Sequence, residues 1–378
     1  RAAQQPLLFV AEDLHWVDPS TLELLSLLVD QGPTTRILTL FTFRPDFPPP
    51  WTGRSHLTQI TLNRLTRRQV AEMIGRVAHG KALPGEVVEQ AVARTDGVPL
   101  FVEELTKMVL ESGLLQERED RYELTGPLPP LAIPTTLHDS LMARLDRLAT
   151  VKGVAQLGAT LGREFSYELL QAVSPLDAAT LQQALTRLVE VELLYQRGVL
   201  PQATYLFKHA LIQEAAYQSL LRSTRQQYHQ RIARVLEERF PEVTTTQPEL
   251  LAHHYTEAGL VQEAPPYWQR AGQQAAERSA HVEAIAHLNQ GLRVLTTLPE
   301  TRERDQQELT LRIDLGKSLI ATKGWASPEA EVAYTRAWEL CQQMRDTSWV
   351  FAVLWGLSQV YMVRADLTKH REVSAQFL

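Results

Sequence analysis

Two adjacent carboxylates, Glu12 and Asp13, follow an unbroken apolar run near the start of the chain. Neighbouring carboxylates can hold a magnesium ion and orient a water molecule beside a phosphate group. The apolar run, Leu7 to Val10, predicts a strand buried on both faces, as in a parallel sheet covered by helices. Open α/β sheets bind ligands at the carboxyl ends of their strands, which is where this acid pair stands.

The segments after the acids predict the elements that would hold them in place. Asp18 and Pro19 form a helix start, with the aspartate as N-cap and the proline at the first helical position. An amphipathic helix is expected over Thr21 to Asp30, and a second apolar strand over Arg36 to Phe43. A strand, paired acids and a helix in this order are the layout of a Walker B segment. Such a segment positions magnesium and an attacking water beside the γ-phosphate of a nucleotide.

The full string LLFVAEDLHWVDPSTLELL closely resembles the Walker B region of the STAND class of signal-transduction ATPases. The most similar branch contains bacterial regulators with an AAA-like ATPase, a winged helix and helical repeats, often behind a class III adenylate or guanylate cyclase domain. This resemblance implies an α/β fold, the C-terminal part of a P-loop NTPase sheet plus a helical lid, then a winged helix and an all-α TPR-like solenoid. The expected boundaries are 1–60 for the partial NTPase core, 61–116 for the lid, 133–225 for the winged helix and 226–378 for the repeats.

The resemblance also implies roles for the first polar residues. Glu12 would hold Mg²⁺ through water and Asp13 would orient the attacking water, although the order Glu-Asp leaves that division open. Arg44, at the end of the second predicted strand, matches an arginine that contacts the γ-phosphate. A guanidinium suits this task because it gives bidentate, permanently charged contacts to phosphate oxygens. The alternative is an arginine that pairs with a loop carboxylate.

Two helices are predicted for the lid, over Leu62 to His79 and Gly85 to Thr95, with Thr66 as an N-cap. The following string DGVPLFVEEL resembles the GxP motif of the same class. By that resemblance Gly97 and Pro99 belong to the nucleotide pocket, with the proline packed on adenine. Otherwise Gly-x-Pro is a turn that starts a helix.

A charged and then proline-rich connection is expected over 117–132, with Pro127, Pro129 and Pro130. From Ile133, helices followed by a hairpin-like stretch (Leu193 to Phe207) are typical of a winged helix. Such a domain can read DNA, but this segment has no basic patch. The resemblance to STAND proteins implies instead that this domain packs on the nucleotide domain and reports its state, and we prefer that interpretation.

The string Phe207-Lys208-His209-Ala210-Leu211 resembles the MHD motif of related STAND switches. That resemblance implies that His209 touches the β-phosphate of ADP. Imidazole suits a sensor of this kind, because a nearby phosphate favours its protonated form near neutral pH. Ala210 stands where the motif has aspartate, and a packed or capping histidine is the alternative.

From Gln247 onward the chain is rich in alanine and helical in pattern. Small, aromatic and leucine residues stand at the offsets of tetratricopeptide repeats, in three successive units: Trp268, Ala271, Gly272, Ala275, Ala284, Leu288 and Gly291; then Leu315, Gly316, Leu319, Ala330, Tyr334 and Ala337; then Leu357, Ser358 and Tyr361. Asp366 is expected at the turn between the two helices of the third unit. Such arrays normally bind protein partners. A plain helical bundle is the alternative.

Composition bounds the remaining possibilities. The 378 residues carry a formal charge of −6, so there is no general attraction to nucleic acid or anionic lipid. No stretch is long and apolar enough to cross a bilayer, and the one cysteine, Cys341, fits a reducing cytoplasm. The adjacent His253 and His254 lack further ligands at metal spacing, which argues against zinc.

The sequence contains no GxxxxGK[ST] loop, starts at Arg1 and stops within an unfinished repeat, so we interpret it as a fragment. Alone, it is expected to bind ATP weakly or not at all and to hydrolyse none. We expect the full-length protein to be an ATPase that uses ATP/ADP and Mg²⁺. The bound nucleotide would switch the packing of the ATPase domain against the winged helix and the repeats. The repeats would bind a protein partner, and ATP binding could drive oligomerisation. The alternatives are a transcription regulator with a downstream DNA-binding helix-turn-helix, or a scaffold whose ATPase has decayed.

Overall fold

The computed structural model of this chain describes residues 5–126, 134, 136–148, 151–345 and 348–376. It divides into two compact units, Arg1–Gln59 together with Leu236–Leu378, and Ile60–Val235. Most described residues are helical, and the strands among them form three small sheets. The predicted fold class, a mixed α/β segment followed by a largely helical chain, is confirmed. None of the described helices has the length and apolar character needed to span a membrane.

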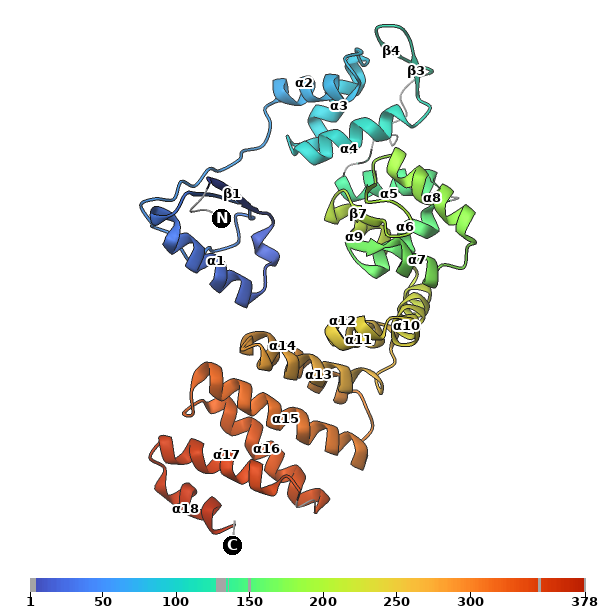
Figure 1. Ribbon diagram of the computed structural model, residues 1–378. Coiled ribbons are helices and arrows are strands. Elements are labelled where there is room, and N and C mark those ends of the chain that lie inside the picture. Colours follow the sequence, from blue (N-terminus) through green and yellow to red (C-terminus); the bar gives the residue numbers. More distant parts are fainter. Residues whose placement is uncertain (1–4, 127–133, 135, 149–150, 346–347, 377–378) are drawn as a thin grey trace. The chain divides into compact units, whose positions relative to one another are not determined.

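The N-terminal segment is a strand–helix–strand unit (Figure 1). Its elements are β1 (Leu7–Ala11), η1 (Leu14–Trp16), α1 (Pro19–Gln31), η2 (Gly32–Thr34) and β2 (Ile37–Phe41). The two strands pair in parallel, with Ala11 opposite Phe41. Asp18 caps α1 by accepting a hydrogen bond from the Thr21 backbone N–H at 2.8 Å, as its sequence position predicted.

The expectation that β1 is buried on both faces is wrong for the described residues. One face of the β1–β2 pair packs on the buried side chains of Leu25, Val29 and neighbouring residues. The other face is open, since Leu8 is 63% exposed and its register partner Leu38 is 70% exposed. A continuous apolar run predicts two covered faces, whereas helix α1 covers only one face of this two-stranded sheet.

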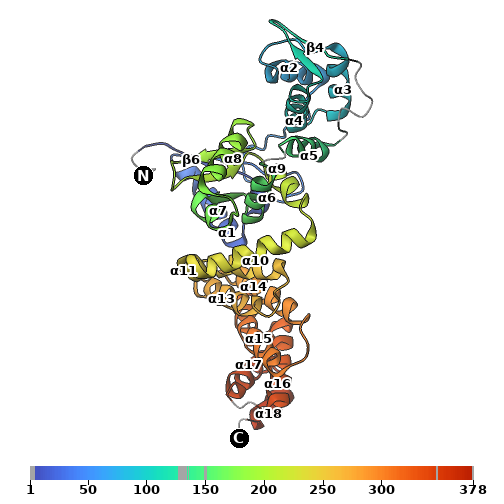
Figure 2. The same cartoon turned by 90° about the vertical axis from the view of Figure 1, so that its right-hand side faces the viewer.

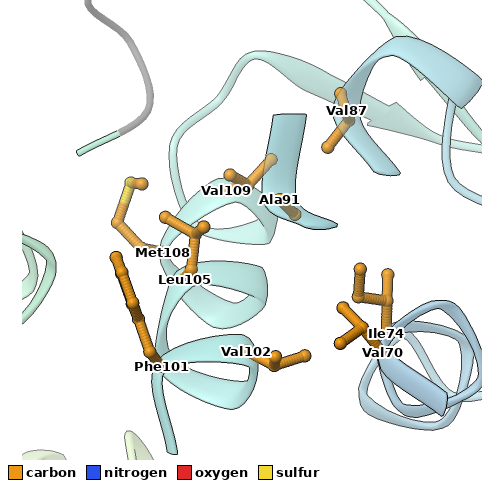
Figure 3. Close-up of a cluster of buried hydrophobic side chains, with 9 residues drawn as sticks. All are labelled: Val70, Ile74, Val87, Ala91, Phe101, Val102, Leu105, Met108 and Val109. Atoms are coloured by element: carbon orange, nitrogen blue, oxygen red, sulfur yellow. The ribbon is translucent and has the colours of Figure 1, made fainter. Parts of the chain in front are cut away.

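The helical lid begins the second unit. It contains α2 (Arg67–Val77), α3 (Gly85–Thr95), α4 (Pro99–Leu110), β3 (Leu115–Glu117) and β4 (Tyr122–Leu124). All three helices contribute to one apolar core, shown in Figure 3, in which Val102, Leu105 and Met108 of α4 are fully buried. Thr66 is the predicted N-cap and forms a capping box with Gln69, which is why α2 begins at Arg67 and not at Leu62.

The segment predicted to be a connection, 117–132, is in part a folded hairpin. Strands β3 and β4 pair in antiparallel, and Leu115 and Leu124 pack against the lid core. The hairpin therefore belongs to the lid, because its apolar residues complete that core. The proline-rich stretch with Pro127, Pro129 and Pro130 lies outside the described residues, as does Ile133.

The rest of the second unit combines helices with a three-stranded sheet. Its elements are α5 (Leu137–Arg147), α6 (Lys152–Leu161), β5 (Glu164–Ser166), α7 (Tyr167–Val173), α8 (Ala178–Glu190), β6 (Leu194–Arg197), β7 (Thr204–Phe207) and α9 (Ala210–Gln218). The strand order is β5-β7-β6, and the antiparallel pairing of β6 with β7 confirms the hairpin expected over Leu193 to Phe207. Gly158 lets α6 approach this sheet, because a Cβ there would lie 2.7 Å from the Phe165 ring.

The C-terminal part consists of helices that follow one another in space (Figures 1 and 2). They are α10 (Arg222–Arg239), α11 (Pro241–Thr246), α12 (Pro248–Ala258), α13 (Ala264–Glu277), α14 (His281–Leu295), α15 (Arg302–Lys323), α16 (Pro328–Met344), α17 (Val350–Val363) and α18 (Leu367–Ala375). The small residues of the predicted repeats lie at helix–helix contacts, where a Cβ on Gly272 would lie 2.5 Å from Leu288. Asp366 caps α18, at the turn predicted for it. Residues 377–378 lie outside the described residues.

Replacing Gly316 with alanine is expected to destabilise the chain by about 1–3 kcal/mol. The added Cβ would lie 2.6 Å from the Tyr334 ring, so α15 and α16 would have to move apart. Urea unfolding followed by circular dichroism measures the change. Gly75→Ala in α2 is the control, because an added methyl there meets nothing within 4 Å, and should stabilise by up to about 1 kcal/mol. Equal effects of both substitutions would show that this contact does not limit packing.

Candidate functional site

The predicted acid pair lies at the carboxyl end of β1. Glu12 and Asp13 are both exposed, and Asp13 has a left-handed backbone with φ of 59°. The backbone N–H of Asp13 donates to the Thr42 hydroxyl at 3.0 Å, and the N–H of Leu14 donates to the Thr42 carbonyl at 2.9 Å. Thr42, which directly follows β2, therefore fixes the turn that carries both acids. Sequence reasoning missed this residue, because a single threonine after a strand has no distinguishing pattern.

Arg44 lies on the loop that leaves the same edge of the sheet. Since Ala11 and Phe41 are in register, the acid turn and the Arg44 loop begin side by side. Arg44 is exposed, and its carbonyl accepts a hydrogen bond from the Phe47 N–H at 3.0 Å. With two carboxylates and a guanidinium at this edge of the sheet, the carboxylates can hold magnesium and the guanidinium can contact the phosphate bound to it.

A metal ion at this edge would need ligands beyond Glu12. Among the described residues no three His, Cys, Asp or Glu side chains gather closely enough to hold a metal ion. Protein-bound magnesium commonly keeps several waters and uses one or two carboxylates plus substrate phosphates.

Gly97 and Pro99 form the turn that starts α4. Gly97 has φ of 69°, and a Cβ at this position would lie 2.2 Å from the Leu65 carbonyl oxygen. The Leu65 N–H in turn donates to the Gly97 carbonyl at 2.8 Å. Only glycine fits this backbone, and Pro99 occupies the first turn of the helix, where its missing N–H costs nothing. The turn is thus explained by local structure, and the adenine contact stays a prediction.

His209 stands immediately before α9, and its side chain makes no capping hydrogen bond. Burial and the neighbouring Lys208 charge lower the pKa of His209 below its usual value, although Glu104 and Glu103 act in the opposite direction. The lowered pKa favours the neutral form of the imidazole near pH 7. An anion bound beside it would be needed to favour the protonated form.

Four charged side chains join the Pro99 helix to the His209 segment; we call them the charge ring. Lys208 Nζ lies 2.6 Å from Glu103 Oε1 and 3.1 Å from Glu192 Oε2. Lys107 Nζ lies 2.8 Å from Glu103 Oε1 and also pairs with Glu192. Glu103 lies four residues after Pro99, and Lys208 immediately precedes His209. The ring therefore brings two of the predicted motifs into direct electrostatic contact.

The charge ring was not anticipated as a site from the sequence, because its members are far apart in the chain. Its pKa shifts follow from the pairing. Hydrogen bonds from Lys107 and Lys208 lower the pKa of Glu192 to about 2. Burial would raise the pKa of Glu103, but hydrogen bonds from the same lysines lower it overall. Glu192 also has φ of 56°, a backbone conformation uncommon for residues other than glycine.

Stability should depend on pH through Glu192. Because its folded pKa lies below the ordinary value of 4.5, the ionised carboxylate stabilises the fold above that value and loses this contribution as the pH falls toward about 2. Glu192 is half-exposed, so solvent screening limits the effect to about 1 kcal/mol. Hydrogen exchange of α4 should show Glu192→Gln less protected than the wild type at pH 7, and this difference should shrink as the pH falls from 4.5 toward about 2. Glu190→Gln is the control, and a constant difference across this range would contradict the assignment.

A second, deeper set of ion pairs lies next to the charge ring. Arg144 of α5 is 2% exposed and pairs with the fully buried Glu104 of α4. Its guanidinium also donates to both oxygens of Glu111, at 3.0 and 3.2 Å, and to the Val191 carbonyl at 2.9 Å. Burial alone would lower the pKa of Arg144, but Glu104 and Glu111 raise it. Members of both sets, namely Glu103, Lys107, Glu111, Arg144 and Glu192, line one cavity of about 790 Å³ in this unit.

The six predicted site residues divide between the two units. Glu12, Asp13 and Arg44 belong to the first, at one edge of the β1–β2 pair. Gly97, Pro99 and His209 belong to the second, which the charge ring links internally. The joint use of these residues by one nucleotide stays a prediction.

No family model matches this chain. An uncharacterized protein of Rhizobium meliloti (strain 1021), R02095, is 29% identical over 362 residues, which cover 93% of this chain and 34% of that protein. The chain thus spans about a third of the length of this curated relative. The crystal structure of a Signal Transduction ATPase with Numerous Domains (STAND) protein with a tetratricopeptide repeat sensor, PH0952 from Pyrococcus horikoshii, aligns with 97% of this chain and 55% of its own. The identity there is 11% and the TM-score 0.44, values too low to establish kinship.

Proposed function

We propose that this chain is the nucleotide-responsive and protein-binding region of a STAND-type signal-transduction ATPase. The observation that carries this proposal is the strand edge where Glu12, Asp13 and Arg44 emerge from neighbouring parallel strands. Open α/β sheets bind their ligands at such an edge. In this proposal Glu12 holds Mg²⁺ through water, Asp13 orients the attacking water and Arg44 contacts the γ-phosphate.

The lid and the elements from α5 to α9 would read which nucleotide is bound. Pro99 would pack on adenine, and His209 would favour the ADP state. We interpret α5 to α9 with their three-stranded sheet as a winged helix. The charge ring supports packing of this domain on the lid over DNA binding, since Lys208 is already paired with Glu103 and Glu192.

The mechanism is a two-state element whose equilibrium the nucleotide shifts. Chemistry at the site would rest on positioning and charge: the carboxylates orient water and metal, and the guanidinium neutralises charge on the transferred phosphoryl group. The helical repeats would bind a protein partner. A cyclase as the output domain and a cytoplasmic location belong to this proposal only through the sequence resemblance.

Arg44→Gln in the full-length gene product tests the proposal. It should weaken binding of a non-hydrolysable ATP analogue about 10- to 100-fold, the effect of losing a hydrogen bond to a charged group. Affinity for ADP, which lacks the γ-phosphate, should not change. Calorimetry with both nucleotides measures the difference.

The control for this test is Arg36→Gln. Arg36 is an exposed arginine that precedes β2, at the opposite end of the same strand. Neither nucleotide should respond to its replacement. Equal weakening of the ATP analogue and ADP by Arg44→Gln, or no weakening at all, would remove Arg44 from γ-phosphate recognition.

A further inference from the structure

The helical repeats contain a cavity of about 430 Å³ with four arginines in its lining; we call it the arginine cavity. It is lined by Asn289, Leu292, Arg293, Leu295, Thr296, Arg304, Glu308, Arg312 and Arg336. These residues come from α14, from the turn that follows it, and from α15 and α16. A cavity of this volume falls in the range of small-molecule sites.

Three of the four arginines converge on one carboxylate. Glu308 Oε1 accepts hydrogen bonds from Arg336 Nε at 3.1 Å and from Arg312 Nε at 3.3 Å. Arg304 Nη2 lies 3.9 Å from Glu308 Oε2. Burial would raise the pKa of Glu308, but Arg336 and Arg312 lower it overall, so the carboxylate is ionised at neutral pH.

A single carboxylate does not balance the arginines. Four arginines against one glutamate leave a formal charge of +3 on the lining, within a chain whose net charge is −6. Two further acids lie at the rim: Glu300, which is 90% exposed and 3.8 Å from Arg304, and Glu339, which pairs with Arg336 at 3.0 Å. Both are well solvated, so they neutralise the interior only weakly.

One donor of a residue that lines the cavity also lacks an acceptor. Arg304 is 15% exposed, and among the described residues its Nε is buried without a hydrogen-bond partner. A buried guanidinium N–H without an acceptor is costly, and an oxygen anion would satisfy it while offsetting the excess charge.

We propose that the arginine cavity binds a small molecule whose phosphoryl or carboxylate groups carry at least two negative charges. Guanidinium groups contact either kind of oxyanion in bidentate fashion. Leu292 and Leu295 supply an apolar wall for the rest of the ligand. The repeats would then receive a chemical signal in addition to the proposed protein partner, at a site separate from the nucleotide residues.

Calorimetry on the full chain at a fixed ionic strength of about 0.15 M tests this site, with inorganic pyrophosphate and citrate as probes. Saturable binding of at least one probe is expected. Pyrophosphate alone identifies a phosphoryl ligand, citrate alone a carboxylate ligand, and both together a site for either group. Arg304→Gln and Arg312→Gln should each weaken binding at least about tenfold, which corresponds to about 1.4 kcal/mol.

Two further variants separate a binding role from a structural one. Glu308→Gln removes the competing negative charge while keeping all four arginines, so it should tighten probe binding several-fold. Arg278→Gln, at an exposed arginine after α13, should leave binding unchanged. Absence of saturable binding by either probe would overturn the proposal. So would weaker binding by Glu308→Gln, or binding that responds to Arg44→Gln and not to Arg304→Gln.

Discussion

Arg144→Met is expected to destabilise residues 60–235 by about 3–5 kcal/mol. Arg144 is 2% exposed, and its partner Glu104 is fully buried, with one carboxylate oxygen that has no hydrogen-bond partner among the described residues. Removing the guanidinium leaves a carboxylate that is desolvated and uncompensated. It also breaks the two hydrogen bonds to Glu111 and the one to Val191, which join α4 to α5 and to the end of α8.

Hydrogen exchange of the intact chain, read on peptides from α4 and α5, measures this effect. Tryptophan fluorescence would not, because none of the seven tryptophans lies between residues 60 and 235. Arg187→Met is the matched control: its ion pair with Glu190 is more than half exposed, so a loss within about 0.5 kcal/mol is expected. Similar exchange in both variants would contradict the structural role of Arg144.

A double variant separates the buried charge from the loss of packing. Arg144→Met combined with Glu104→Leu removes both charges of the buried pair, so much of the lost protection should return. The free-energy loss of the double variant is compared with the sum of the losses of Arg144→Met and Glu104→Leu measured separately. If the two values were equal, the two residues would not be energetically coupled.

Local structure could be predicted from the sequence where neighbouring residues determine it. Asp18 and Thr66 cap helices at the expected positions, because a cap depends on backbone N–H groups two or three residues away. The turn at Gly97, which the sequence offered as the alternative to a nucleotide role, and the close-packed glycines of the repeats could also be predicted, since their backbone and spacing are encoded locally.

Contacts between distant segments could not be predicted in this way. Lys208 and Glu103 are separated by 105 positions and Lys107 and Glu192 by 85, so no local pattern marks the charge ring. Part of the arginine cavity has a local signal in the sequence. Arg304, Glu308 and Arg312 follow a four-residue spacing, which places them on one face of a helix. Arg336, from the next helix, completes the cluster through tertiary packing alone.

The burial of β1 shows a different limit. The apolar run predicted a strand covered on both faces. Apolar composition indicates which faces of a strand can be buried, but it does not indicate how many helices or strands pack against those faces. The exposed face of β1 and β2 therefore has the composition of an interior surface.

Asp13→Asn in the full-length gene product is expected to lower ATP hydrolysis about 10²- to 10⁴-fold, the range for removing a positioned base. ATP binding should persist, because asparagine keeps the shape of the side chain and the backbone bond to Thr42. Asp120→Asn, in the turn between β3 and β4, is the control and should hydrolyse ATP at the wild-type rate. Unchanged turnover by Asp13→Asn would remove this residue from the mechanism.

The most direct measurement of the central claim is calorimetric titration of Mg-ATP into the wild-type full-length protein and the Asp13→Asn variant, alongside their hydrolysis rates. The account predicts saturable binding of one nucleotide per chain in both proteins and turnover only in the wild type. Absence of nucleotide binding by the wild type, or equal turnover by both proteins, would contradict it.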